Sequence, residues 1–203
     1  MNNKNLLVVF VKNPIQGKAK TRLAASIGAP AALKVYRKLI AITEKETLAV
    51  GDCDLHVYFS NEKDDKLWTG KQQYFQKGTD LGERMYRAFE HGFNLGYERI
   101  VGVGSDLPDL TAGIISQGLE LLKSFDTVFG PAGDGGYYLV GMSQKIKCIF
   151  EHKEWSTEGL LNETLTEIKE KGYSNTLLEV LNDVDTVEDL RTSSLATEFA
   201  EYL

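Results

Sequence analysis

Ile100-Val101-Gly102-Val103-Gly104-Ser105-Asp106-Leu107-Pro108-Asp109 runs from an apolar block into a loop with two carboxylates. The block at 100–103 is typical of a strand buried in a sheet, and Pro108 stops that strand from continuing. Open α/β sheets bind ligands at the carboxyl ends of their strands. We therefore expect Asp106 where a divalent cation would meet a phosphorylated substrate. The alternative is a loop whose Asp only caps a helix beginning near Thr111.

The rest of the chain alternates strand patterns with helical ones. Short apolar runs predict strands at residues 6–11, 54–59, 73–75, 100–103, 127–129, 137–140 and 175–178. Helix-like spacing and capping residues predict helices at 30–49, from a capping box at 80–83, and at 111–122, 157–170 and 187–202. Alternation over the whole length predicts an α/β fold with three layers, α/β/α, around a mostly parallel sheet. We expect residues 1–203 to form one domain.

Composition narrows the class of protein. The chain has 203 residues, of which 42% are hydrophobic and 26% charged, as in ordinary globular proteins. The apolar run at 6–11 is too short for a secretory signal, and no run approaches the ~18 residues of a membrane span. Cys53 and Cys148 have no metal-ligand spacing. We expect a cytoplasmic protein, and the net charge of −6 argues against a nucleic-acid binder. The oligomeric state stays open.

A basic loop follows the first predicted strand. Lys12, Lys18, Lys20 and Arg22 lie within twelve residues that also contain Gly17. Ammonium and guanidinium groups neutralise phosphate oxygens, and backbone N–H groups add oriented dipoles. The loop does not have the spacing of a Walker loop. We interpret it as a phosphate cradle, with a solvated basic loop as the alternative.

Two further segments carry glycines where a ligand could approach the backbone. Gly82 lies in a first helical turn, where its low helix propensity indicates that something packs closely, a nucleotide or sugar being one possibility. Asp134 lies between glycines just before the strand that begins at Tyr137. Asp134 could orient or deprotonate an acceptor hydroxyl, or only form a tight turn. Tyr137 fits either sugar stacking or the core.

Acids also precede the last predicted helix. Thr186 alone is enough to cap that helix, so Asp183 and Asp185 are available as a second metal ligand and its supporting residue. Trp155 and Ser156, before the preceding helix, offer an indole and a hydroxyl, although a core tryptophan beside a helix cap explains them equally simply.

Taken in order, six segments resemble one family. It is a small bacterial family with the glycosyltransferase-A fold, formerly a domain of unknown function and now often labelled a glycosyltransferase of arsenosugar biosynthesis. The same fold includes molybdenum-cofactor and phospholactate nucleotidyltransferases. The segments that carry the resemblance are 12–23, 80–85, 104–108, 134–139, 155–157 and 183–190.

The resemblance implies a metal-dependent glycosyltransferase that moves a sugar from a nucleoside diphosphate sugar to a small-molecule acceptor. Asp106, with Asp185, would hold Mg²⁺ or Mn²⁺, and Asp134 would act on the acceptor. The first alternative is a nucleotidyltransferase that uses a nucleoside triphosphate and releases pyrophosphate. The second is a non-catalytic nucleotide-binding regulator. The residues expected to bind substrate are Lys12, Lys18, Lys20, Arg22, Gly82, Glu83, Arg84, Ser105, Gly135, Gly136, Tyr137, Trp155 and Ser156.

Overall fold

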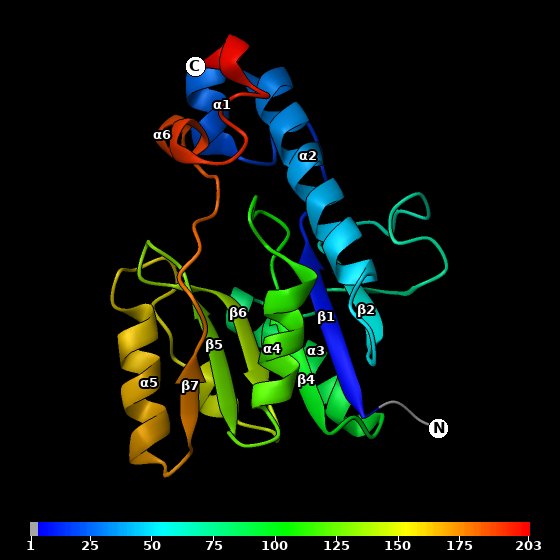
Figure 1. Ribbon diagram of the computed structural model, residues 1–203, viewed down its shortest axis with the longest axis vertical. Helices are drawn as coiled ribbons and strands as arrows, with labels where there is room; N and C mark the ends of the chain where they lie inside the picture. Colours follow the sequence, from blue (N-terminus) through cyan, green and yellow to red (C-terminus); the bar gives the residue numbers. More distant parts are fainter. Residues whose placement is uncertain (1–3) are drawn as a thin grey trace.

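The computed structural model describes residues 4–203, which form a seven-stranded sheet with helices on both faces (Figure 1). The strand order is β3-β2-β1-β4-β6-β5-β7, and only β6 is antiparallel to its neighbours. The predicted α/β fold with a mostly parallel sheet is confirmed. The strands are β1 (Asn5–Val11), β2 (Asp54–Phe59), β3 (Gln72–Phe75), β4 (Arg99–Val103), β5 (Thr127–Pro131), β6 (Tyr137–Met142) and β7 (Asn175–Leu177).

The predicted helices occur in the predicted order, with two corrections to their extent and one additional helix. The 157–170 helix begins at Leu160, the 187–202 helix ends at Thr192, and an unpredicted short helix, α1, follows the basic loop. The last helix stops early because Ser193 is extended and its hydroxyl accepts the N–H of Leu195. The helices are α1 (Thr21–Ile27), α2 (Ala29–Leu48), α3 (Leu81–Asn94), α4 (Ala112–Leu121), α5 (Leu160–Glu170) and α6 (Val187–Thr192), with 3₁₀ turns at Lys147–Ile149 and Ala200–Tyr202.

The expected capping box at 80–83 is only half formed. Asp80 caps α3 by accepting the N–H of Glu83. The Glu83 carboxylate, however, accepts from the N–H and hydroxyl of Thr79 rather than from Asp80. At α6 both halves are present, between Thr186 and Asp189. The starts of α3 and α6 were therefore predicted correctly, but the hydrogen-bond partner expected for Glu83 was wrong.

The core lies on both faces of the sheet. Leu7, Val9 and Val11 of β1 join the cluster beneath α1, α2 and α4, whereas Leu6 and Val8 join the cluster beneath α3 and α5. This two-sided burial explains why β1 is a continuous apolar run. Each fully buried Val or Leu side chain contributes about 1.5–3 kcal/mol to folding. No helix within residues 4–203 is long and apolar enough to cross a membrane.

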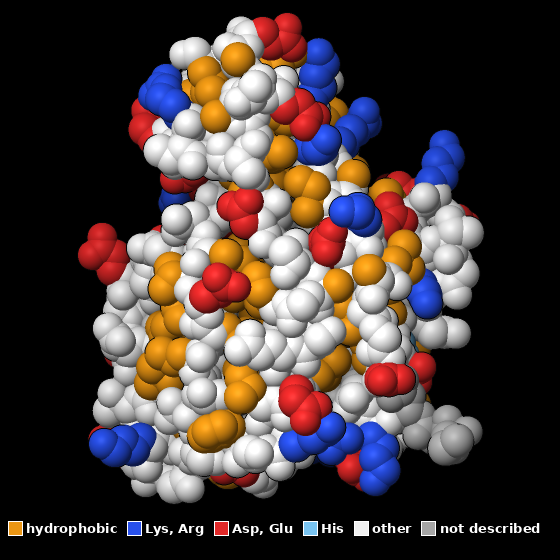
Figure 2. Space-filling view, viewed as in Figure 1, with side chains coloured by type: hydrophobic (Ala, Val, Ile, Leu, Met, Phe, Trp, Pro, Cys, Tyr) orange, Lys and Arg blue, Asp and Glu red, His pale blue; other side chains and the backbone are white. Residues whose placement is uncertain are grey.

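The strand order places a crevice beside β1 and β4. The chain moves outward from β1 to β2 and β3, then returns to the other side of β1 as β4. Such a reversal is where open α/β sheets bind ligands, beyond the carboxyl ends of the strands. At that end stand α1, α6 and the first turns of α2, above the strands in Figure 1. On the face seen in Figure 2, acidic and basic side chains are interspersed.

Candidate active site

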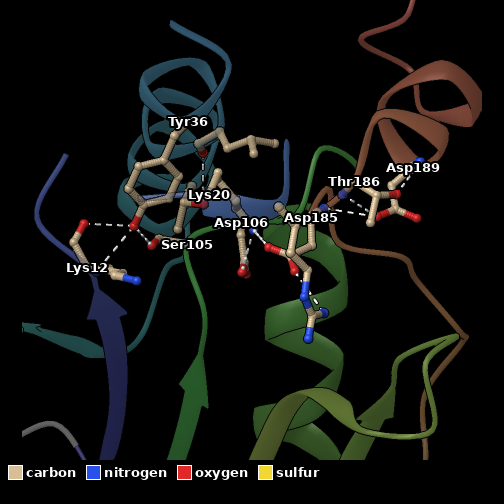
Figure 3. A network of polar contacts seen from close by, with 11 residues as sticks. Lys12, Lys20, Tyr36, Ser105, Asp106, Asp185, Thr186 and Asp189 are labelled. Carbon is tan, nitrogen blue, oxygen red and sulfur yellow. Dashed lines mark hydrogen bonds and ion pairs between the residues drawn. The ribbon is translucent and has the colours of Figure 1, made fainter. Parts of the chain in front are cut away.

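Lys20 and Asp106 meet at the crevice, one after β1 and the other after β4. The Lys20 ammonium lies 3.0 Å from Oδ2 of Asp106 and 3.7 Å from Oδ1 of Asp185 (Figure 3). Only 6% of the Lys20 side chain is exposed. Lys20 is in the left-handed region, with φ of 49°, and its carbonyl begins α1 by accepting the N–H of Ala24. Non-glycine residues in this region carry strain, which is often found at functional sites.

The electrostatics of this group are those of a crowded acidic site. Burial opposes the charge of Lys20, but Asp106 and the other acids outweigh it, so the pKa of Lys20 is raised. Burial and the charges of Asp106, Asp134 and Asp185 raise the pKa of Asp183 to about 6, although Lys20 acts in the opposite direction. The crevice therefore has more negative charge than Lys20 alone neutralises.

Asp185 is held in place by the start of α6. Its backbone N–H, and that of Thr186, donate to Oδ2 of Asp189 at 3.0 and 2.7 Å. The exposed Arg22 donates to Oδ2 of Asp185 at 3.2 Å. The capping box of a short helix thus fixes a carboxylate that faces Lys20 from a segment far away in the sequence (Figure 3).

Tyr36 of α2 joins the loops that follow β1 and β4. Its hydroxyl donates to the Lys12 carbonyl at 2.8 Å, accepts the Lys12 N–H at 3.2 Å, and lies 3.1 Å from the Ser105 hydroxyl (Figure 3). Burial raises the pKa of Tyr36, so the hydroxyl stays protonated at neutral pH. Tyr36 lies within the helix predicted at 30–49, but the sequence analysis missed this role.

Two cavities meet at Asp106. The basic cavity has a volume of about 490 Å³ and the acidic cavity about 300 Å³. Phe10, Leu81, Gly104 and Asp106 line both. In addition to these four, the basic cavity is defined by Lys12, Ala19, Lys20, Tyr36, Ser60, Asn61, Gln76, Arg84, Ser105 and Asp185. The acidic cavity is defined by the same four together with Asp134, Asp183, Gly136, Tyr137, Trp155, Ser156 and further, mostly apolar, residues.

The glycine loop before β6 aims Asp134 at the acidic cavity. The Gly136 N–H donates to Oδ1 of Asp134 at 2.9 Å, so the tight turn and the placement in a cavity occur together. Gly135 has a φ of 87°, and a Cβ there would lie 2.1 Å from the Glu158 carbonyl oxygen. Gly135 is therefore required by the packing of this chain, and it lies outside the lining of the cavity.

Most of the predicted site residues lie on one of the two cavities. Exceptions are Lys18 and Arg22 of the basic loop, and Gly82, Glu83 and Gly135. The close approach predicted at Gly82 exists, but its neighbours belong to the chain: a Cβ there would lie 2.2 Å from the carbonyl oxygen of Phe150 and 2.8 Å from Trp155. The carboxylate of Glu83 bonds to Thr79, which holds its pKa at about 2.

The sequence reasoning missed the polar residues at the ends of β2 and β3. Ser60, Asn61 and Gln76 line the basic cavity. Gln76 also ties strand ends together, because its side-chain amide donates to the carbonyls of Val11 and Tyr58. Polar residues directly after two predicted strands were the signal that could have identified them.

The carboxylate oxygens in the crevice suit a hard divalent cation as ligands. Mg²⁺ and Mn²⁺ prefer carboxylate oxygens, and Mg²⁺ is usually bound by one or two carboxylates together with substrate phosphates. Asp106 and Asp185 flank the Lys20 ammonium and are 37% and 34% exposed, so both remain accessible. Residues 4–203 contain no group of three or more His, Cys, Asp or Glu residues arranged as a complete metal cage. The pair therefore fits a cation that a phosphorylated substrate helps to hold.

Solved structures share this fold. A protein from Desulfovibrio desulfuricans G20, provisionally named a nucleotide-diphospho-sugar transferase, is 28% identical, with a TM-score of 0.88 and 98% of each chain covered. The inositol-1-phosphate CTP transferase from T. maritima is 12% identical, with a TM-score of 0.60, over 98% of this chain and 95% of that one. The 4-diphosphocytidyl-2C-methyl-D-erythritol synthase from Anaerococcus prevotii is 10% identical, with a TM-score of 0.61, over 97% and 100%.

Sequence comparison identifies the family. No curated protein matches the chain. The model of the family described as uncharacterized protein conserved in bacteria (DUF2064) matches residues 43–157, which is more than half of the 203 residues. The matched region includes the Asp106 loop and Asp134. With the segment resemblance and the shared fold, this match shows that the chain belongs to the DUF2064 family.

Proposed function

We propose that this protein is a metal-dependent glycosyltransferase that moves a sugar from a nucleoside diphosphate sugar to a small-molecule acceptor. One observation carries the proposal: Asp106 lies on the border of two cavities, one basic and one acidic. The basic cavity suits a diphosphate, and the acidic one suits the group that attacks. A carboxylate between them is where a cation on the diphosphate would be wanted.

The donor would lie in the basic cavity. Lys20 and Arg84 would neutralise the diphosphate as charge develops on the leaving group, and the exposed Lys12 would add a third cation. Mg²⁺ or Mn²⁺, held by Asp106 and Asp185, would supply Lewis-acid stabilisation of the phosphate oxygens. Tyr36 and Ser105 would fix the loops that carry these groups.

The acceptor would lie in the acidic cavity. Asp134 would orient the acceptor hydroxyl and take its proton as the new bond forms. Gly136 would keep this carboxylate in place through its hydrogen bond. Ser156, in the left-handed region with φ of 64°, lines the same cavity and would contact the acceptor.

Nucleotidyl transfer is the second candidate. The similarity of the fold to a CTP transferase supports it, because the same basic cavity could hold a nucleoside triphosphate. In that reaction a phosphorylated acceptor would attack the α-phosphate and pyrophosphate would leave. Fold-level likeness alone does not separate the two chemistries.

Product analysis separates them. The protein is incubated with Mg²⁺ or Mn²⁺ and panels of sugar nucleotides and nucleoside triphosphates, and the released phosphates are identified by chromatography and mass. Release of nucleoside diphosphate is expected for glycosyl transfer, whereas release of pyrophosphate would replace this proposal by the second. Metal-dependent nucleotide binding without any turnover across both panels would instead favour the non-catalytic regulator.

A further inference from the structure

The acidic cavity contains three carboxylates and no basic side chain. Asp106, Asp134 and Asp183 line it, and none of the described residues in its lining is Lys, Arg or His. The basic cavity, on the other side of Asp106, is lined by Lys12, Lys20 and Arg84. The basic side chains that line these two cavities therefore all lie in the lining of the basic one.

The remaining lining of the acidic cavity is mostly apolar and aromatic. The rings of Tyr137 and Trp155 meet edge to face, with centroids 6.4 Å apart, and Met85 and Leu160 add aliphatic surface. The volume of about 300 Å³ is at the lower end for ligand pockets. Such a space accepts a molecule the size of one substituted ring.

A phosphate or carboxylate in this cavity would face like charges, with no basic side chain among the residues that line it. Two carboxylates, Asp134 and Asp183, belong to this cavity alone. Like charges at short range in a partly desolvated space disfavour binding strongly. An anion that is buried without a partner also loses its hydration. A neutral molecule avoids both costs, and a cationic one is attracted.

We propose, building on the proposed function, that the acceptor is a hydroxylated molecule of about one ring that carries no phosphate or carboxylate. Its ring lies against Tyr137 and Trp155, and its hydroxyl faces Asp134. During transfer, the acceptor oxygen forms a bond to the anomeric carbon while the bond from that carbon to the diphosphate breaks. The electron pair leaves on the diphosphate, and the hydroxyl proton passes to Asp134. The acidic cavity thus disfavours a phosphorylated acceptor, which is the acceptor that nucleotidyl transfer would use.

Three matched probes test the charge selectivity directly. Tyrosol, tyramine and 4-hydroxyphenylacetate share a phenol ring and differ in carrying a neutral, a cationic or an anionic tail at pH 7.5. Binding is followed by fluorescence of Trp155, which lines the cavity. Trp68 is fully buried and its indole donates to Thr47, so it supplies a constant background. Trp155→Phe should therefore abolish the signal.

The neutral and cationic probes should bind at least about tenfold more tightly than the anionic one. Asp134→Asn keeps an oxygen for the Gly136 N–H but removes the charge, so it should reduce this preference about threefold. Asp65→Asn is the matched control, since the exposed Asp65 lines neither cavity. Equal or tighter binding of the anionic probe, or no response to any probe, would overturn the inference.

The outcome is distinguishable from failure of the proposed function. The fluorescence titration requires neither donor nor turnover, whereas the proposed function is judged by the released phosphate product. A preference for the neutral and cationic probes together with pyrophosphate release would retain the cavity's selectivity and reject glycosyl transfer. Release of nucleoside diphosphate together with tightest binding of the anionic probe would support glycosyl transfer and reject the proposed selectivity of the cavity.

Discussion

The Lys20 ammonium lies 3.0 Å from the Asp106 carboxylate, although 86 residues separate them in the sequence. The lysine side chain is almost fully buried, and Asp185 approaches it from a third segment at 3.7 Å. A buried ammonium that touches two carboxylates keeps its charge, because the pair compensates for lost hydration. The same cation lines the basic cavity, so it can also face a phosphate.

Lys20→Ala should weaken the binding of nucleoside diphosphates by about tenfold or more, while the binding of the corresponding nucleosides changes little. The reason is that the ammonium interacts with phosphate and not with the base. Calorimetric titration of both ligands, with and without Mg²⁺, measures the difference. Lys18→Ala is the control, because Lys18 is exposed and lines neither cavity. Equal losses for diphosphate and nucleoside would contradict a phosphate role for Lys20.

Asp106→Asn should abolish metal-dependent nucleotide binding and leave the fold intact, since the change removes one charge at a partly exposed loop position. Thermal unfolding with nucleoside diphosphate, and with Mg²⁺, Mn²⁺ or chelator, reports the loss, because ligands that bind the folded state raise the midpoint. Asp109→Asn should behave like the wild type, since Asp109 is exposed and lines neither cavity. Unchanged metal dependence in Asp106→Asn would remove Asp106 from the proposed metal site.

The loops that contain Lys20 and Asp106 could be predicted, because the ends of strands can be recognised in the sequence. The end of an apolar run locates the carboxyl end of a strand. Asp106 follows the run at 100–103 closely, and Lys20 lies in the loop after the run at 6–11. The contact between Lys20 and Asp106 could not be predicted, because it depends on the left-handed conformation of Lys20 and on α1. That helix has seven residues and no capping side chain. Short helices carry little periodic signal.

Long-range packing limited the prediction elsewhere. Low helix propensity at Gly82 signalled a close neighbour, but not that the neighbour is the Phe150 carbonyl. Similarly, Tyr36 has the spacing of a buried helical residue, and only the tertiary fold brings its hydroxyl to Lys12 and Ser105. The residues with chemistry at strand ends were thus predictable, whereas the residues that position them were not.

Asp183→Asn should stabilise the metal-free protein at pH 7–8 and have no such effect near pH 4. Burial and the neighbouring acids raise the pKa of Asp183 in the folded protein to about 6, above its ordinary value of 3.8. Below the ordinary value the carboxyl is protonated in both states, and stability is lost as the pH rises through the folded pKa. At pH 8, Asp183→Asn should raise the free energy of unfolding by about 1 kcal/mol, a figure that is reduced because Asp183 is partly exposed.

Urea unfolding of both proteins in chelator, at pH 4, 6 and 8, measures this difference. Asp65→Asn, at an exposed site, should show no comparable pH dependence. A destabilised Asp183→Asn protein at pH 8 would mean that the Asp183 charge is favourable in the folded state, and it would assign the carboxylate a structural ion-pairing role.

Gly82→Ala should destabilise the protein by about 2 kcal/mol, because the added methyl group must displace the Phe150 backbone and the Trp155 ring. Gly113→Ala is the matched control in the first turn of α4, where the nearest atom would be 3.6 Å from the new Cβ. There the better helix propensity of Ala should instead stabilise by about 0.5–1 kcal/mol. Urea unfolding compares the stability of the two variants, and Trp155 fluorescence adds a local readout.

The same substitution should affect the acidic cavity, because Trp155 lines it. Tyrosol binding should be weaker in Gly82→Ala, where the Trp155 ring is displaced, and unchanged in Gly113→Ala. If Gly82→Ala were as stable as the wild type, the segment around Phe150 would have to move without cost. The tight contact with α3 would then not be what holds Trp155 in place at the acidic cavity.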